Sequence, residues 1–260
     1  LLQGRVAEAE KVFITGIRLL LSLGLSYDST ILIDSVLLLC TAYVADQNFT
    51  AAIEQYDHVR QTAQENLFYY QKNIELNPDI MLLLVEAGRI DEALQLISKA
   101  LENYRIFFGT DHPVTAEIIA LRALTHAAKG DKQNALEDFS EAMPILLKER
   151  TKIETNYPKK MRFRFLVKEY LKLLGDIYKA NKEEQFRIDA SAESFNLVQI
   201  LIDSSANKAL GATSARAASL HPSLADLVRK EQDLTKQILA LRATAQNALS
   251  VSPDQQNPDA

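Results

Sequence analysis

One pattern of residues occurs twice in the middle of the chain, and it limits the possible folds more than any other feature. In the first copy Gly88 precedes Ala93 by five residues, and Ile97 follows that alanine by four. The second copy has the same spacing, with Gly130, Ala135 and Phe139. Glycine ends a helix at positive φ without strain, alanine lets two helices cross closely, and the large residue fills the gap to a neighbour. The pattern therefore predicts repeated pairs of antiparallel helices.

The alanine of this pattern recurs along the first half of the chain, at spacings of 43, 41 and 42 residues. The four positions are Ala9, Ala52, Ala93 and Ala135. Twelve residues before the last three stand Cys40, Met81 and Ala123, which we place on the first helix of each pair. In such an array each pair covers the apolar side of the next, so the 260 residues need no single globular core.

Apolar spacing, caps and breaks predict helices over 6–23, 31–45, 50–70, 79–87, 91–108, 114–129, 132–148, 163–180 and 189–202. Pro144 should kink the seventh of these helices or end it early, because proline removes a backbone donor. The helix over 6–23 is the second member of a pair whose first member is missing. We therefore expect the chain to be a piece of a longer protein.

The sequence divides into a repeat array over 1–188, a C-terminal helical hairpin over 189–250 and a loose tail over 251–260. The apolar residues of this hairpin alternate at spacings of three and four, interrupted by Glu231, as on a helix with one partner helix. They are Leu224, Leu227, Leu234, Ile238, Leu241 and Ala245. The tail has two prolines and no large apolar residue beyond Val251.

The repeat spacing is longer than the roughly 34 residues of a standard tetratricopeptide repeat and falls among HEAT repeats. The glycine turn, the alanine and the large residue four positions later nevertheless resemble tetratricopeptide repeats. The segment Phe-Phe-Gly-Thr-Asp-His-Pro-Val-Thr-Ala around Gly109 resembles the inter-repeat turn of long variants in kinesin light chains and bacterial arrays. This resemblance implies an all-α fold, a right-handed superhelical α-solenoid of helical hairpins, that binds a protein or peptide.

The region 189–241 carries a second resemblance, through Ala-Glu-Ser-Phe-Asn-Leu at 192–197 and His-Pro-Ser-Leu-Ala-Asp-Leu at 221–227. It is similar to the segment between the repeats and the caspase-like peptidase domain of bacterial CHAT-domain proteins. In that family the catalytic His and Cys lie beyond the point where this chain ends. The resemblance implies a non-catalytic sensor or regulatory region, with the parent's own C-terminal domain as one partner.

The inner groove of the array is the first candidate binding site. Counted from the alanine positions, it should include Leu37, Thr41, Val44, Leu82, Val85, Ala120, Leu124 and Ala127. These residues are mainly apolar, so the groove suits an amphipathic helix. The Lys and Asn residues that hold a peptide carboxylate in chaperone-binding relatives are absent. Alternatively, tight closure of the superhelix or another part of the full-length protein covers the groove.

The only basic run of this acidic chain, which has net charge −5, lies between Lys148 and Lys168. We interpret it as a solvated connection that leads into a helix starting at Phe163. The alternative is a patch for acidic partners, with RNA sensing as the alternative function, formed by Lys159, Lys160, Arg162 and Arg164. Tyr157, Phe163 and Phe165 would supply the aromatic rings that such a site needs.

Nothing in the sequence predicts an enzyme, a cofactor or a metal. No histidine is paired at helical spacing with another His, a Cys or a suitable set of carboxylates, and Cys40 has no nearby base. The four histidines are His58, His112, His126 and His221. The apolar runs are too short to cross a bilayer, which disfavours a membrane partner. The single cysteine is compatible with a reducing compartment, so the cytoplasm is favoured, although a signal peptide would be lost with the missing start.

Overall fold

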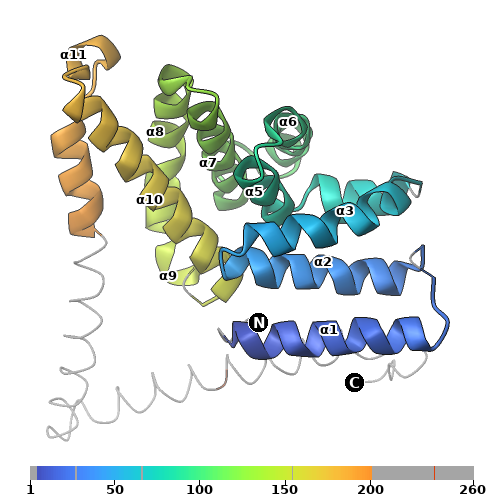
Figure 1. The fold of residues 1–260 in the computed structure, drawn as a ribbon. Helices are drawn as coiled ribbons and strands as arrows, with labels where there is room; N and C mark the ends of the chain where they lie inside the picture. Colours follow the sequence, from blue (N-terminus) through green and yellow to red (C-terminus); the bar gives the residue numbers. More distant parts are fainter. Residues whose placement is uncertain (1–4, 27, 66, 154, 201–236, 238–260) are drawn as a thin grey trace, which may run out of the picture. The chain divides into compact units, whose positions relative to one another are not determined.

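Residues 5–26, 28–65, 67–153, 155–200 and 237 are described by a computed structural model, and all regular secondary structure among them is helical (Figure 1). The chain divides into two units, Leu1–Phe195 and Asn196–Ala260, and the helices below belong to the first. The predicted hairpin over 189–250 and the tail lie outside the described residues, apart from 189–200 and Gln237.

The helices follow the predicted pairs closely. They are α1 (Val6–Ser22), α2 (Thr30–Ala45), α3 (Phe49–Glu65), α4 (Leu67–Tyr70), the π-helix η1 (Gln71–Glu75), α5 (Pro78–Glu86), α6 (Ile90–Phe108), α7 (Pro113–Ala128), α8 (Lys132–Lys148), α9 (Arg150–Ile153), α10 (Tyr157–Lys179) and α11 (Glu183–Phe186). A further helical stretch covers 190–200, of which only 190–195 belong to the first unit. Helix α1 packs on α2, and the successive hairpins are α2–α3, α5–α6 and α7–α8.

Local signals place the helix ends. Ser29 Oγ accepts a hydrogen bond from the Leu32 amide at 3.3 Å and so caps α2 as expected. Between the helices of two hairpins, Gly88 and Gly130 adopt φ values of 73° and 81°. At the equivalent turn between α2 and α3, Gln47 has a φ of 59°, a conformation that glycine adopts without the steric cost.

The repeat positions form the interior of the array. Ala52, Ala93 and Ala135 have no exposed surface, and neither do Tyr56, Ile97 and Phe139 four residues after them. Cys40 Sγ donates a hydrogen bond to the Ala52 carbonyl oxygen at 3.5 Å, so the residue twelve before the alanine lies on the facing helix. The predicted packing of these positions is confirmed.

The first helices of the hairpins lie in series, because α2 contacts α5 and α5 contacts α7. They form the inner layer of the array, and α3, α6 and α8 form the outer layer (Figure 1). The first unit is thus an all-α helical-repeat solenoid.

Of the two outcomes predicted at Pro144, a kink or an early helix end, the early end did not occur, because α8 runs through Pro144 to Lys148. Two other local predictions were wrong. The helix expected to end at residue 70 continues through α4 and η1 to Glu75, with residue 66 outside the described part. The basic run from Lys148 is no connecting loop. It contains α9 and the start of α10, which begins at Tyr157 because Asn156 caps it and Pro158 lies in its first turn.

Candidate functional site

Helix α10 lies along the inner layer of the array, where the groove was predicted. It contacts α2, α7 and α8 (Figure 1). Its apolar side is buried along almost the whole length, from Phe163 and Leu166 through Tyr170 to Leu174 and Ile177. At one end Phe165 packs edge-to-face on Phe49 of α3, and further along the Tyr170 ring stacks on Phe139 of α8 at 4.7 Å. Much of the inner surface is therefore occupied by the chain itself.

Most of the predicted groove residues are not open to solvent. Leu37, Val44, Leu82, Val85, Ala120 and Leu124 are buried, whereas Thr41 and Ala127 are half-buried. The sequence analysis had named closure of the superhelix, or another part of the full-length protein, as what could cover the groove. The helix that packs there, α10, corresponds to the helix predicted over 163–180, which nothing in the sequence placed on the inner side of the array.

A buried group of ion pairs, the Arg162 cluster (Arg162, Asp79 and Glu117), fixes α10 on the array. Arg162 Nε donates to Glu117 Oε1 of α7 at 2.8 Å, and its Nη1 donates to Asp79 Oδ1 of α5. All three side chains are almost completely buried. The two carboxylates raise the pKa of the Arg162 guanidinium against the opposing effect of its burial, so the arginine stays charged. Each charge needs the others, because an unpaired buried charge is costly.

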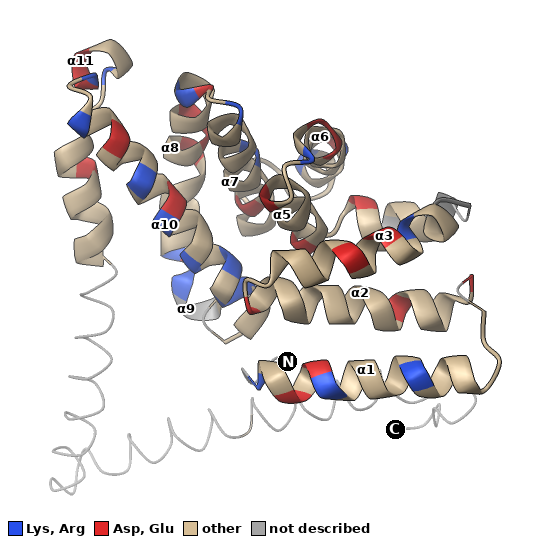
Figure 2. Cartoon of the chain, in the orientation of Figure 1, with Lys and Arg blue, Asp and Glu red and all other residues tan. Residues whose placement is uncertain are grey.

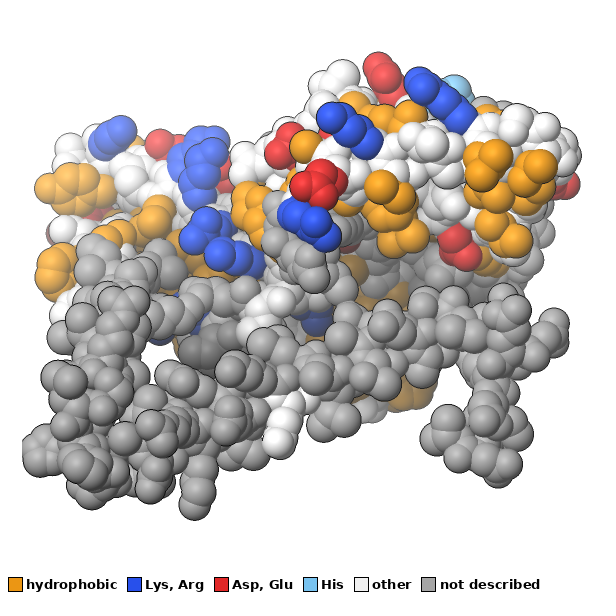
Figure 3. Space-filling model, turned by 90° about the horizontal axis from the view of Figure 1, so that it is seen from below, with side chains coloured by type: hydrophobic (Ala, Val, Ile, Leu, Met, Phe, Trp, Pro, Cys, Tyr) orange, Lys and Arg blue, Asp and Glu red, His pale blue; other side chains and the backbone are white. Residues whose placement is uncertain are grey.

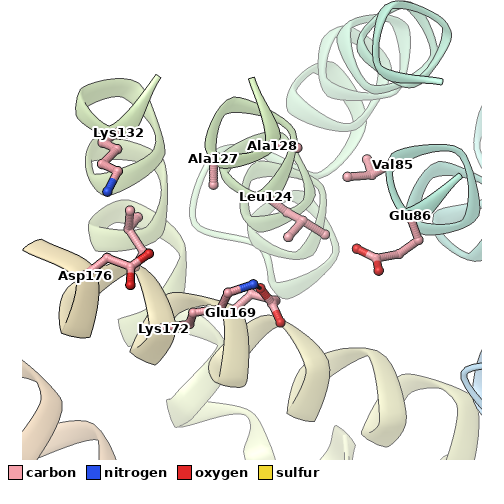
Figure 4. A pocket seen from close by; sticks show the side chains of 10 residues that line it. Val85, Glu86, Leu124, Ala127, Ala128, Lys132, Glu169, Lys172 and Asp176 are labelled. Carbon is pink, nitrogen blue, oxygen red and sulfur yellow. Dashed lines mark hydrogen bonds and ion pairs between the residues drawn. The ribbon is translucent and has the colours of Figure 1, made fainter. Parts of the chain in front are cut away.

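A part of the inner surface remains open beside α10 and forms a pocket of about 290 Å³, here called the groove pocket (Figure 4). It is lined by Val85 and Glu86 of α5, Leu124, Ala127 and Ala128 of α7, Lys132 of α8, and Glu169, Lys172, Leu173 and Asp176 of α10. Three predicted groove residues, Val85, Leu124 and Ala127, thus line one cavity together with residues of α10.

The groove pocket combines an apolar base with a charged rim. Val85, Leu124 and Leu173 are buried and form the base. On the rim, Glu86 of α5 faces Glu169 and Lys172 of α10 across the opening (Figure 4). Lys172 Nζ lies 3.2 Å from Glu169 Oε2. Burial raises the pKa of the Glu86 carboxyl, and Glu169 raises it further, while Lys172 and Lys168 lower it.

The basic patch predicted on Lys159, Lys160, Arg162 and Arg164 is only partly on the surface. Lys and Arg residues do occur close together along α9 and the first half of α10 (Figure 2). Arg162, however, points inward to its two carboxylates, and Phe163 and Phe165 are buried. Lys159 and Arg164 are exposed and Lys160 is half-buried. The structure therefore separates the exposed charges from Phe163 and Phe165, and only the half-buried Tyr157 remains partly accessible beside them.

We next consider where the histidines and Cys40 lie in the fold. His112 Nδ1 accepts a hydrogen bond from the Val114 amide at 3.3 Å and caps α7. His58 lies on α3 and His126 on α7 beside Asp131 and Asp138, while His221 is outside the described residues. Burial raises the pKa of the Cys40 thiol to about 12. Within the described ranges, no group of three or more His, Cys, Asp or Glu side chains could hold a metal ion.

Exposed apolar side chains elsewhere on the first unit are scattered among charges (Figure 3). The most exposed large ones include Val12, Leu19 and Leu23 around α1, and Ile106 and Phe107 at the end of α6. No helix in the described part of the chain is both long and apolar enough to cross a bilayer.

Comparison with known families identifies a tetratricopeptide repeat in residues 82–148. These residues run from α5 to the end of α8 and include two complete turns with their glycine and alanine. The match supports the choice of tetratricopeptide over HEAT repeats for this region. No curated protein matches the chain.

Proposed function

We propose that this chain is a non-catalytic scaffold that binds a protein or peptide at the inner side of its helical repeats. Tetratricopeptide repeats generally mediate protein–protein interaction, and residues 82–148 match that family. One observation carries the choice of surface: Val85, Leu124 and Ala127 of the predicted groove still line an open cavity beside α10. The partner enters there and not along the whole groove, because α10 covers the rest.

Binding of an amphipathic partner helix along the full groove is less well supported than binding of a short peptide segment at the groove pocket. A helix in the position of α10 would have to replace the buried contacts of Phe163, Leu166 and Tyr170. It would also leave Asp79 and Glu117 without Arg162. A peptide segment at the groove pocket requires neither change.

We further propose that the repeats are the sensor region of a larger bacterial CHAT-type peptidase. The similarity of 189–241 to the segment before the peptidase domain in that family is the support for this proposal. Binding at the repeats would then be passed to the C-terminal domain of the parent protein. The coding sequence downstream of Ala260 tests this step, since a caspase-like domain with a His and a Cys supports it and any other domain contradicts it.

RNA sensing through 148–168 has less support than protein binding. Two of the three aromatic rings that would stack on bases, Phe163 and Phe165, are buried, and Arg162 is held by Asp79 and Glu117. No observation favours this alternative over the scaffold.

Site-specific crosslinking tests the proposed surface. A photoreactive amino acid replaces Ala128, which is exposed and lines the groove pocket, or Gln95, which is exposed on α6 outside it. In cell extract, Ala128 should yield a discrete crosslinked protein that Gln95 does not. Identical products at both positions, or no crosslinked protein at all, would contradict the proposal.

A further inference from the structure

The groove pocket is large enough to hold one long side chain. Its volume of about 290 Å³ lies at or just below the lower end of cavities that take drug-sized ligands, roughly 300–1,000 Å³. The buried side chains of Val85, Leu124 and Leu173 give it an apolar base. The charged groups stand only at the rim (Figure 4).

Lysine and arginine side chains have the same division, with an apolar stem and a charged end that stays near water. A leucine or phenylalanine would fill the base but would bring no group to the carboxylates of the rim. An aspartate or glutamate is too short to cover the base and would face Glu86 and Glu169.

The charged residues of the rim favour binding of a cation near Glu86, on the side of the pocket that α5 forms. The pocket carries three carboxylates, on Glu86, Glu169 and Asp176, against the two ammonium groups of Lys132 and Lys172. Lys172 pairs with Glu169, and Lys132 lies at the same side of the pocket as Asp176 (Figure 4). Glu86 projects into the opening from the opposite side, with Lys168 as a further cation in its surroundings.

Helix ends add to this preference. Val85 and Glu86 are the last residues of α5, and Ala127 and Ala128 are the last residues of α7. The C-terminal end of a helix carries a partial negative charge and stabilises cations nearby. Two such ends therefore meet at the pocket, against one N-terminal end, that of α8 at Lys132.

We propose that the groove pocket binds an arginine or lysine side chain of a protein partner, with the stem on Val85, Leu124 and Leu173 and the charged end at Glu86 and Glu169. This inference rests on the proposed function and specifies the chemistry of the partner. The scaffold would recognise a basic residue presented on an exposed segment, and it would reject the same segment with an acidic residue at that point.

The test uses the full chain and small probes of one side chain each. The probes are the acetylated methylamides of arginine, lysine, norleucine and glutamate, and binding is followed by the methyl NMR signals of Val85, Leu124 and Leu173. Arginine and lysine should shift these signals, and norleucine, which has a similar stem without the charge, should bind at least about fivefold more weakly. Equal binding of norleucine, stronger binding of glutamate, or no shift with any probe would overturn the inference.

Two matched variants test whether the carboxylate of Glu86 binds the charged end of the probe. Glu86→Gln should weaken arginine binding by about tenfold, which corresponds to about 1.4 kcal/mol. Glu102→Gln, at an exposed position on α6 outside the pocket, should leave it unchanged. An unchanged affinity in Glu86→Gln contradicts the inference. If Ala128 still crosslinks a protein while the arginine probe does not bind, the scaffold function stands and only the basic-residue inference fails.

Discussion

Arg162 Nε on α10 lies 2.8 Å from Glu117 Oε1 on α7, although 45 residues separate them in the chain. The same guanidinium donates to Asp79 on α5, so a single side chain joins three helices in the interior. Arg162→Met should lower the free energy of unfolding by about 3–5 kcal/mol, because two buried carboxylates lose their partner. Urea denaturation measures this loss. Arg164→Met, at an exposed position two residues away, should change stability by less than about 0.5 kcal/mol.

The cost should come from the orphaned carboxylates and not from the loss of the arginine itself. Arg162→Met combined with Asp79→Leu and Glu117→Met replaces the whole cluster by apolar groups, which is often close to neutral. We therefore expect the triple variant to recover more than half of the lost stability. A triple variant less stable than Arg162→Met alone would contradict this explanation.

The alanine of each repeat should tolerate no larger side chain. Ala135 is fully buried where α8 crosses α7, so Ala135→Leu should destabilise the chain by about 1–3 kcal/mol through overpacking. Ala128→Leu adds the same atoms at an exposed position and serves as the control. Thermal unfolding followed by circular dichroism compares the two, and equal midpoints would show that close crossing at Ala135 is not required.

The repeat architecture could be predicted from sequence because its signals are local and recur. The turn glycines Gly88 and Gly130, and the alanines five residues later, mark where two helices of a hairpin turn and cross. Each signal requires only that two helices adjacent in sequence pack closely. The tetratricopeptide match covers the region where these signals are strongest.

The position of α10 could not be predicted, because it depends on partners distant in sequence. Arg162 appeared as one of several surface cations, and nothing near it shows that Asp79 and Glu117 would enclose it. The sequence does contain one signal for the start of α10. Asn156 and Pro158 resemble Asn77 and Pro78 at the start of α5, where an asparagine side chain also caps a helix with proline in its first turn.

Cys40 should be inert in the folded protein and should make the chain less stable in alkali. Burial raises the pKa of its thiol from 9.0 to about 12, so the unfolded state loses its proton first as the pH rises. The folded state then binds more protons, and the stability present below pH 9 falls between about pH 9 and 12.

Two measurements check this expectation. Reaction of the native chain with a disulfide reagent at pH 8 should proceed no faster than unfolding. The free energy of unfolding should fall more steeply above pH 9 in the wild type than in Cys40→Ala. Rapid labelling of the native thiol, or equal slopes in the two proteins, would contradict the assigned burial.

The exposed cations at the start of α10 should not make the chain an RNA-binding protein. Lys159 and Arg164 are exposed, but Phe163 and Phe165 beside them are buried and present no ring to a base. Gel-shift experiments with single-stranded RNA should show no complex at low salt. A complex that dissociates with added salt and is lost in Lys159→Glu with Arg164→Glu would restore the RNA alternative.

The central claim is that α10 fills the inner side of the repeat array, and amide hydrogen exchange tests it most directly. The amides of Leu166, Tyr170 and Leu174 in α10 should exchange as slowly as those of Ile118 and Leu121 in α7, since both helices are buried in one packed unit. Exchange of the α10 amides at the rate of an unstructured peptide, while α7 remains protected, would contradict the account.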